Sequence, residues 1–307
     1  MTSSPFCHIC DCRVDCWDIY AKRASWTYVR CPDCSLVLLH PVPEEDTLRS
    51  YYNRTYEVNL AKHVKDCQRG AAAVLADLKE RFPKRGRLLE VGCSYGAFLS
   101  EARRDGWDVT GIELSETAAR HAREYRGLRV LSGQLTDHVE QLGDKFDAVV
   151  LFHVIEHVPN PVQLLQMCRR ITKPHGLLIL KTPNVASLIA RATGSSWQWL
   201  TAPAHLCLYS PRSMERLLQR AGYDLQYYRS AQGDANNHFF AVLSSAARRV
   251  LCKTDKSFSS SLRQSLGVKI AEAICEFLYS PLGLLLDPWL GRKLLQPELY
   301  AVASKSA

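Results

Sequence analysis

The stretch "LLEVGCSYGAFL", from Leu88 to Leu99, decides the fold of this 307-residue chain. An apolar run ends at Val91, Gly92 and Gly96 bracket a tight turn, and apolar periodicity then resumes. That order predicts a strand, a glycine-containing loop and a helix, as in nucleotide-binding α/β domains. A dinucleotide fingerprint would have a further glycine at Ser94, so this loop is a shortened version of that pattern.

Strand-like and helix-like segments alternate after this loop. The strand-like runs are "RLLEVG", "WDVTGIE", "LRVLSG", "FDAVVLFH" and "GLLILKTPN". Such alternation predicts a parallel sheet with helices on both faces, whose ligands lie beyond the carboxyl ends of the strands. Glu113 ends the second run, roughly 20 residues after Gly92. A carboxylate there can accept both ribose hydroxyls, while Gly92 and Gly96 let the backbone approach a ligand closely.

Together these motifs resemble the class I S-adenosylmethionine-dependent methyltransferases. The resemblance covers residues 87 to 228 and rests on "EVGCSYG", "GIELS", "FDAVVLFHVIEHVPNP", "KPHGLLILKTPN" and "HLCLYSPRSMERLLQRAGY". It implies a Rossmann-like α/β sheet of seven strands with the last one antiparallel, and S-adenosylmethionine as cofactor. The cofactor-binding residues that it implies are Glu90, Gly92, Cys93, Gly96, Glu113, Leu114, Gln134, Leu135 and Phe152.

The resemblance also implies what each part of the cofactor would contact. Glu90 and the two glycines would line the methionine part, Glu113 would hold the ribose, and Leu114 would pack on the adenine. The segment around Gln134 and Leu135 would lie at the purine edge, where the family pattern often has an acidic residue. A structural alternative stays open for Glu113, which could simply cap the next helix.

The segment "FHVIEH" supplies His153, Glu156 and His157 at the end of the fourth strand-like run. A histidine, with a reference pKa of about 6.5, can take a proton from an acceptor near neutral pH, and a carboxylate can orient it. We therefore predict His153 or His157 as the general base of methyl transfer. The alternative is that Glu156 and His157 cap the following helix and never touch the substrate.

A second-choice base is His205, in "SSWQWLTAPAHLCLYS" at residues 195–210. The family places a substrate lid there, and the two tryptophans suit either a lid or the core. Ubiquinone-pathway O-methyltransferases have an acidic residue, part of a metal site, where this chain has His153, which argues against a catalytic divalent metal. The chain also lacks the Asx-Pro-Pro-aromatic turn of many nucleobase methyltransferases at Leu151 to His153.

Two C-x-x-C pairs near the N-terminus predict a small zinc ribbon. Cys12, Cys16 and His8 remain alternative ligands. A closed four-sulfur site leaves no open coordination position for catalysis, so the predicted zinc is structural. The four predicted ligands are Cys7, Cys10, Cys31 and Cys34.

The C-terminal part departs from the minimal fold. An apolar helical face with tryptophan and basic flanks, at residues 266–293, suits a membrane interface, a partner subunit or the body of the protein. The alternating "ELYAVASK" at 298–305 predicts the final antiparallel strand, which makes the preceding segment a helical insertion. The predicted units are a zinc ribbon at 1–40, a helical linker or cap at 41–85, the cofactor-binding core at 86–235, the insertion at 236–296, and the final strand and tail at 297–307.

The composition bounds the function. There is no basic-then-apolar leader and no apolar run of about 18 residues, so we predict a cytoplasmic protein, with peripheral membrane contact left open.

The predicted activity is methyl transfer to oxygen or carbon of a small-molecule, sugar or lipid-linked acceptor, as in bacterial methyltransferases that carry such a ribbon. One alternative is an RNA methyltransferase, which the net charge of +8 permits but its scattered basic residues disfavour. The other is a non-catalytic binding protein on the same fold.

Overall fold

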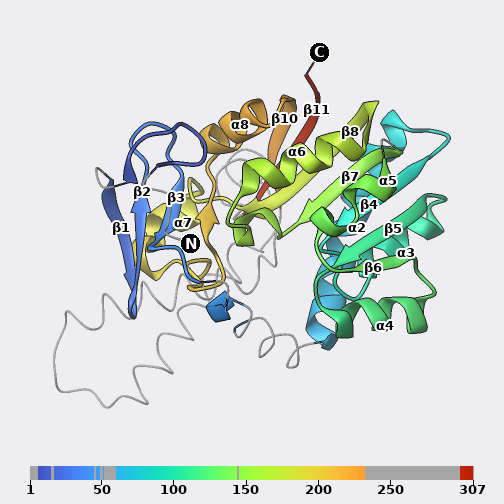
Figure 1. Ribbon diagram of the computed structural model, residues 1–307, viewed down its shortest axis with the longest axis horizontal. Helices are drawn as coiled ribbons and strands as arrows, with labels where there is room; N and C mark the ends of the chain where they lie inside the picture. The colour runs from blue at the N-terminus through green and yellow to red at the C-terminus, as the bar shows by residue number, and fades with distance from the viewer. Residues whose placement is uncertain are drawn as a thin grey trace, which may run out of the picture.

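A computed structural model describes residues 6–14, 17–44, 46–48, 51, 60–143, 145–231 and 298–306. Within these residues the chain forms a 7-stranded sheet and a separate 4-stranded sheet. In Figure 1 the smaller sheet lies to the left and the larger one to the right.

The larger sheet has the strand order β10-β11-β8-β7-β4-β5-β6. Its central strands pair in parallel, and β11 is antiparallel to both of its neighbours, β8 and β10. The predicted α/β class with an antiparallel last strand is therefore confirmed. The strands are β4 (Arg87–Val91), β5 (Asp108–Glu113), β6 (Val130–Ser132), β7 (Phe146–Phe152), β8 (Thr172–Pro183), β10 (Tyr223–Ala231) and β11 (Glu298–Lys305).

Helices cover both faces of this sheet, as apolar strands with two buried faces require. Buried residues of α2, α3 and α4 form one core cluster with the first face, and those of α5, α6 and α8 form another with the second. Helix α2 packs through Ala71, Val74 and Leu78, so it completes the first of these layers. The helices are α2 (Leu60–Arg81), α3 (Ala97–Arg104), α4 (Glu116–Arg126), α5 (Val139–Leu142), α6 (Pro161–Ile171), α7 (Leu188–Thr193) and α8 (Pro211–Arg220), with 3₁₀ turns η2 (Leu135–Asp137), η3 (Ile155–His157) and η4 (Gly194–Ser196).

The smaller sheet belongs to the N-terminal ribbon but includes one strand from far along the chain. Its strands β1 (Asp18–Arg23), β2 (Trp26–Arg30) and β3 (Val37–His40) are antiparallel. β3 also pairs with β9 (Cys207–Leu208), which precedes α8. The ribbon is thus joined to the part that contains the larger sheet by backbone pairing as well as by a shared core cluster.

Residues 232–297, between β10 and β11, lie outside the described part of the chain. The predicted helical insertion at 236–296 and its apolar face at 266–293 therefore stay predictions, as does a role for Cys16. Among the described helices, none combines the length and the apolar character needed to cross a bilayer.

Candidate active site

The loop between β4 and α3 is the sharp turn that its glycines predict. Gly92 and Gly96 have φ of 75° and 72°, in the left-handed region, and Ser94 joins them at 48°. A Cβ on Gly92 would collide with Val154, and one on Gly96 would collide with Leu128. Both glycines are therefore required by the backbone conformation and by packing against other parts of the protein. Their predicted approach to a ligand stays a prediction.

Glu113, at the end of β5, faces this loop. Its Oε2 accepts the backbone N–H of Ser94 at 2.8 Å, and its Oε1 accepts that of Ser115 at 2.8 Å. The helix cap is supplied instead by the Ser115 hydroxyl, which accepts the N–H of Ala118. Each carboxylate oxygen has a further lone pair. The carboxylate is therefore fixed beside the loop and can still accept from a ribose.

Glu90, at the end of β4, is 5% exposed. Its Oε2 has no hydrogen-bond partner within the described residues. Burial, and then the nearby charge of Glu113, raise the pKa of this carboxyl well above its usual range. A buried acceptor without a donor is costly, so this position suits a ligand that brings an ammonium or hydroxyl group. Together with Glu113, it fits the amino and ribose groups of S-adenosylmethionine.

The other predicted cofactor residues differ in exposure. Leu114 is 60% exposed beside Glu113, which suits an apolar contact with a base. Cys93 is buried, with its sulfur against Gly111 in the core. Phe152 is half-buried and meets Phe98 edge-on at 4.9 Å. Leu114 is thus the apolar member of the set that is most open to a ligand.

The purine-edge segment is held by a local cap. Leu135 is buried at 3% exposure, whereas Gln134 is exposed. The backbone N–H of Gln134 donates to Asp137 Oδ2 at 2.8 Å. The chain therefore does have an acidic residue in this segment, although three positions after Gln134.

His153, just after β7, is tied at both ring nitrogens. Its Nδ1 lies 3.2 Å from Glu156 Oε1, and its Nε2 lies 3.2 Å from Glu298 Oε1. Burial opposes the charge, but the hydrogen bonds and charges of the two carboxylates prevail and raise the pKa of His153 to about 9. A protonated ring cannot accept a proton, so of the two predicted bases this geometry favours His157 over His153.

The two carboxylates beside His153 have further partners. Glu156 is fully buried and its Oε2 accepts the Thr182 hydroxyl at 2.9 Å, while Glu298 Oε2 lies 2.7 Å from Lys181 Nζ. Burial would raise both carboxyl pKa values, but His153 first, then Lys181 at Glu298 and the other histidines at Glu156, lower each to about 2. Sequence reasoning missed Glu298, from β11, and Lys181, from β8, because nothing local shows that these two strands bring their side chains to the site.

His157 and His205 are fixed by backbone carbonyls. His157 Nδ1 lies 2.9 Å from the Ala204 oxygen, and His205 Nδ1 lies 2.6 Å from the Trp199 oxygen. A carbonyl only accepts, so each Nδ1 carries a proton, and in the neutral ring Nε2 carries the lone pair. Burial, and then the charge of His157, lower the pKa of His205 to about 4. His205 is therefore neutral near pH 7.

Trp199 joins these groups into one stack. Its ring is stacked on His153 at 5.4 Å and on His205 at 5.5 Å, and the His205 ring meets His157 edge-on at 4.8 Å. The predicted candidates His153, Glu156, His157 and His205 are thus brought together. The sequence signalled an aromatic lid at residues 195–210 but not this arrangement.

Two groups of side chains can hold a metal ion. The sulfurs of the four predicted zinc ligands lie within 4.8 Å of one another, with Cys7 to Cys34 at 3.6 Å and Cys10 to Cys31 at 3.4 Å. Zinc with bonds of about 2.3 Å in a tetrahedron needs sulfurs about 3.8 Å apart, so the cluster fits zinc. Cys12 lies outside it, with its sulfur near the Arg13 oxygen.

The second group combines Glu156, His157 and His205, whose ligand atoms lie within 4.8 Å of one another. A carboxylate and two imidazoles are donors that suit a divalent transition metal. The sequence disfavoured a catalytic metal because His153 replaces an acidic residue. The structure assembles a different donor set, in which a histidine from a distant segment takes part.

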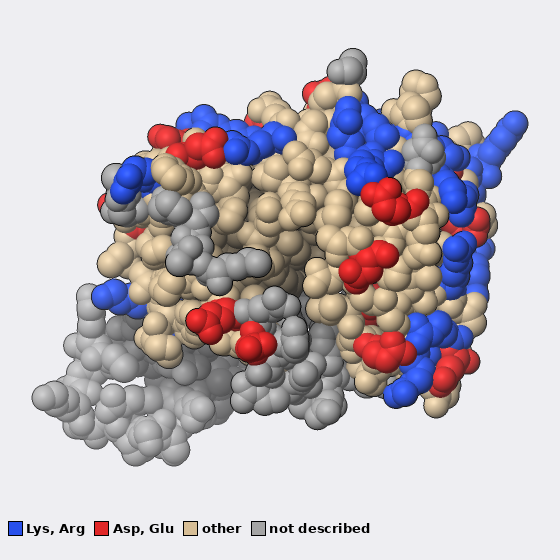
Figure 2. Space-filling view, viewed as in Figure 1, with Lys and Arg blue, Asp and Glu red and all other residues tan. Residues whose placement is uncertain are grey.

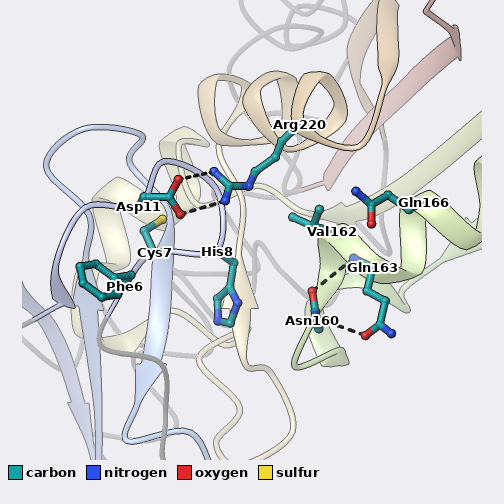
Figure 3. Close-up of a pocket in the computed structure, with 9 residues that line it drawn as sticks. All are labelled: Phe6, Cys7, His8, Asp11, Asn160, Val162, Gln163, Gln166 and Arg220. Atoms are coloured by element: carbon teal, nitrogen blue, oxygen red, sulfur yellow. Dashed lines mark hydrogen bonds and ion pairs between the residues drawn. The ribbon is translucent and has the colours of Figure 1, made fainter.

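A cavity of about 530 Å³ lies between the first cysteine pair and α6. Arg220, from α8, crosses beside it and forms a forked ion pair with Asp11 at 2.6 and 2.9 Å, as Figure 3 shows. In the space-filling view of Figure 2, a hollow separates the ribbon from the larger part of the protein.

Fold and site together define a Rossmann-like methyltransferase. Residues 63–228, more than half of the chain, match the family described as "Methyltransferase domain", and the chain belongs to that family. The predicted S-adenosylmethionine-dependent methyltransferase is thereby confirmed as the class of this enzyme.

Two relatives with assigned names are similar to part of this chain. A "Ubiquinone biosynthesis O-methyltransferase" of Cereibacter sphaeroides is 32% identical over 165 residues, which are 50% of this chain and 67% of that protein. One from Alkalilimnicola ehrlichii is 38% identical over 105 residues, 32% of this chain and 42% of that protein. The matched region therefore spans between about two fifths and two thirds of these relatives.

Solved structures agree on the fold. Burkholderia thailandensis 1,6-didemethyltoxoflavin-N1-methyltransferase is similar with a TM-score of 0.51 at 13% identity, over 94% of this chain and all of that one. A chain in the complex of the Haloferax volcanii Trm112 methyltransferase activator with a methyltransferase has a TM-score of 0.53 at 15% identity, over 85% of this chain and 98% of that one. At this identity the likeness concerns the fold alone.

Proposed function

We propose that this enzyme transfers a methyl group from S-adenosylmethionine to a hydroxyl oxygen of a small-molecule acceptor, with His157 as the base. The observation that carries the proposal is the fixed tautomer of His157 beside the buried carboxylate of Glu156. The β7 end that carries them is next to the β4 end that carries Glu90, because the two strands are parallel neighbours. The named relatives, which are O-methyltransferases, support oxygen as the acceptor atom.

The residues divide the work as follows. S-adenosylmethionine supplies an electrophilic methyl group. Glu113 and Glu90 bind its ribose and amino groups and so fix the direction in which the methyl group points, since in-line placement provides most of the rate. His157 Nε2 takes the acceptor proton, while Ala204 holds the opposite nitrogen. The ionised Glu156, with its pKa near 2, stabilises the positive charge that His157 then acquires.

The acceptor we propose is an aromatic hydroxyl compound. Trp199, half-buried and parallel to two imidazole rings, makes flat rings a major part of the site. Flat aromatic acceptors stack on such surfaces at 4.5 to 7 Å between ring centres. The relatives are named for the biosynthesis of a quinone, a flat ring compound, which supports this class of acceptor. Sugar and lipid-linked acceptors, and methylation at carbon, become alternative outcomes of the assay.

The proposal includes two metal sites, one structural and one at the acceptor. The four-cysteine cluster would hold a structural zinc ion. Glu156, His157 and His205 would hold a divalent cation, which would favour the ionised form of a coordinated acceptor hydroxyl. In that variant His157 Nε2 would be a ligand instead of the base, and the acceptor proton would pass to water.

The test is an assay with labelled methyl donor over matched phenols, catechols, sugars and lipid-linked sugars, with products identified by mass spectrometry. We expect a methyl ether of an aromatic hydroxyl, and activity without added metal in the presence of EDTA if His157 acts alone. Activity restored only by a divalent cation would favour the three-ligand site. Label on carbon or nitrogen, or folded zinc-loaded protein that fails to bind S-adenosylmethionine by calorimetry, would refute the proposed function.

A further inference from the structure

The ribbon makes its backbone contacts with the segment that carries His205. Leu38 pairs with Cys207 and Val37 with Leu208 where β3 meets β9. The Leu39 N–H then donates to the Leu206 oxygen at 2.8 Å. β9 is therefore a strand of the ribbon's sheet, and Leu206 extends the contact by one residue, although the ribbon lies far away in the sequence.

A side chain of the ribbon extends this contact to His205 itself. The Tyr28 hydroxyl, on β2, donates to the His205 backbone oxygen at 3.0 Å. Tyr28 is fully buried, and burial raises its pKa far above the ordinary value, so the hydroxyl stays protonated and donates. A backbone carbonyl accepts only, which fixes the direction of this bond.

The same segment binds the H-x-x-E-H turn on its other side. The Leu206 N–H donates to the Glu156 backbone oxygen at 2.8 Å, and the Ala204 oxygen accepts from His157. The Tyr209 hydroxyl donates to the Ile155 oxygen at 3.3 Å. Residues 204–209 thus lie between the ribbon and the turn that carries the proposed base, with backbone bonds to both.

Two residues of the cysteine cluster, Cys31 and Cys34, lie in the turn between β2 and β3. Cys31 follows the last residue of β2, and its N–H donates to the Leu36 oxygen at 2.8 Å, which closes the turn into β3. Cys34 and Leu36 are fully buried in that turn. The cluster that would bind zinc therefore fixes the positions of β2 and β3. These strands carry Tyr28 and the edge that pairs with β9.

We propose that the ribbon is a positioning element of the acceptor site, in which Tyr28 and the edge of β3 hold residues 204–208 against His157. Tyr28 is a positioning residue, since it contacts the backbone of His205 and no reacting group. The consequence is that metal occupancy of the cysteine cluster controls the acceptor half of the site. The catalytic part of this inference rests on the proposed function, whereas its structural part can be measured without an acceptor.

The experiment compares Tyr28→Phe with Tyr20→Phe in the full-length, zinc-loaded protein. Tyr20 is a half-buried tyrosine of the same ribbon, with Arg30 over its ring, and it is the matched control. Hydrogen exchange followed by mass spectrometry should accelerate about threefold to tenfold in residues 204–208 of Tyr28→Phe, the factor expected for one buried hydrogen bond. Exchange in residues 88–99 should stay unchanged, as should both segments in Tyr20→Phe.

Activity provides the second measurement. In Tyr28→Phe we expect a lower kcat with an unchanged affinity for S-adenosylmethionine. Tyr20→Phe should change neither quantity. A loss of kcat confined to Tyr28→Phe, with cofactor affinity retained, is a result that a general weakening of the ribbon would not produce.

Zinc removal extends the test. After chelation, or in Cys31→Ser, residues 204–208 should lose protection together with the ribbon, while residues 88–99 keep theirs. Unchanged exchange of residues 204–208 in Tyr28→Phe would overturn the positioning role, whatever the acceptor proves to be. Faster exchange in a protein that methylates no aromatic hydroxyl would instead leave the ribbon contact standing and remove only the proposed reaction.

Discussion

The two halves of the proposed active site, a cofactor half around Glu90 and Glu113 and an acceptor half around His153 and His157, are built in opposite ways. The cofactor half comes from neighbouring strands and the loop after one of them, and its key carboxylate, Glu113, is held by backbone groups of Ser94 and Ser115. The acceptor half is assembled from β7, β8, β11, the ribbon and the segment before β9. A site built from segments that are close in the sequence tolerates substitutions elsewhere in the chain. A site assembled from distant segments depends on each of them.

Their electrostatics differ as well. In the acceptor half, positive and negative side chains neutralise one another: the His153 imidazolium lies between Glu156 and Glu298, and Lys181 lies beside Glu298. In the cofactor half the charge of Glu113 helps to raise the pKa of Glu90, whose Oε2 has no partner among the described residues. The cofactor half is thus complementary to a cationic ligand, as a sulfonium with an ammonium group is.

The strongest test of the acceptor half is His157→Ala. Removing a general base should lower kcat by about 10²- to 10⁴-fold, with S-adenosylmethionine affinity unchanged by calorimetry. The matched control is His175→Ala, because His175 is exposed on β8 at the strand's far end. His153→Ala should cost less than His157→Ala, since His153 is protonated. Equal rates for His157→Ala and wild type would refute the base assignment.

The corresponding test of the cofactor half is Glu113→Gln. A hydrogen bond to a charged group contributes about 1.5 to 3 kcal/mol, so the dissociation constant for S-adenosylmethionine should rise by about 10- to 100-fold. Glu116→Gln is the control, because Glu116 is an exposed residue of α4 that pairs with Arg123. If both variants bind with wild-type affinity, Glu113 does not hold the ribose.

This contrast also explains what could be predicted from the sequence. The fold followed from the alternation around Leu88 to Leu99, since period and turn chemistry are local properties. Of the predicted cofactor residues, Glu113 could be singled out because it ends a strand in that pattern, whereas Glu90 followed only from the resemblance to a family. Glu298 could not, because its role depends on strand order in the sheet, and β11 lies next to β8 only once the whole sheet is formed.

Charge states were likewise beyond the sequence. His153 and His157 are equivalent as letters in "FHVIEH", and only the pair of buried carboxylates around His153 separates them. The ribbon was predicted as a separate structural unit, because its cysteine spacing carries no information about β9. The four predicted zinc ligands, in contrast, were identifiable from spacing, and their sulfurs do lie together.

Zinc analysis tests the dependence of the acceptor half on the ribbon. Wild-type protein should contain about one zinc ion per chain, and Cys31→Ser should lose it, because three thiolates bind far more weakly than a closed tetrahedral set. Cys12→Ser should keep the metal, since Cys12 lies outside the cluster. S-adenosylmethionine affinity should be retained in a folded Cys31→Ser protein. Zinc retained by Cys31→Ser would mean that the ligand set is different.

The charge network around His153 predicts a pH-dependent stability. The folded pKa of His153, about 9, lies above its usual 6.5, so its contribution is complete below pH 6.5 and is lost as pH rises through 9. The carboxyls of Glu156 and Glu298 have pKa values near 2, below the usual 4.5, so their contribution is complete above pH 4.5 and is lost as pH falls through 2. This network is therefore most stabilising between pH 4.5 and 6.5.

Thermal unfolding between pH 6 and pH 9.5 measures this contribution. The wild-type Tm should fall over that range, by about 2–4 °C for each kcal/mol lost. His153→Asn should flatten the dependence, and asparagine tolerates the left-handed backbone at this position, where φ is 55°. The exposed His175→Ala is again the control. A slope that is the same in His153→Asn would place the titrating group elsewhere.

The smallest expected effect is that of salt on the turnover of a small acceptor. Lys and Arg side chains lie along the upper, left and right margins of the face in Figure 2, with acidic residues among them, rather than in the hollow between the two parts. A nucleic-acid substrate gripped through 6–10 phosphates would lose about 10³- to 10⁵-fold in affinity between 50 and 200 mM salt. A neutral aromatic acceptor held by Trp199 and His157 releases no such counterions, so its KM should change by less than about twofold over that range. The charged groups of the acceptor half already neutralise one another, so a steep salt dependence would mean that the substrate binds outside it. The RNA methyltransferase hypothesis would then replace the proposal of a small-molecule acceptor.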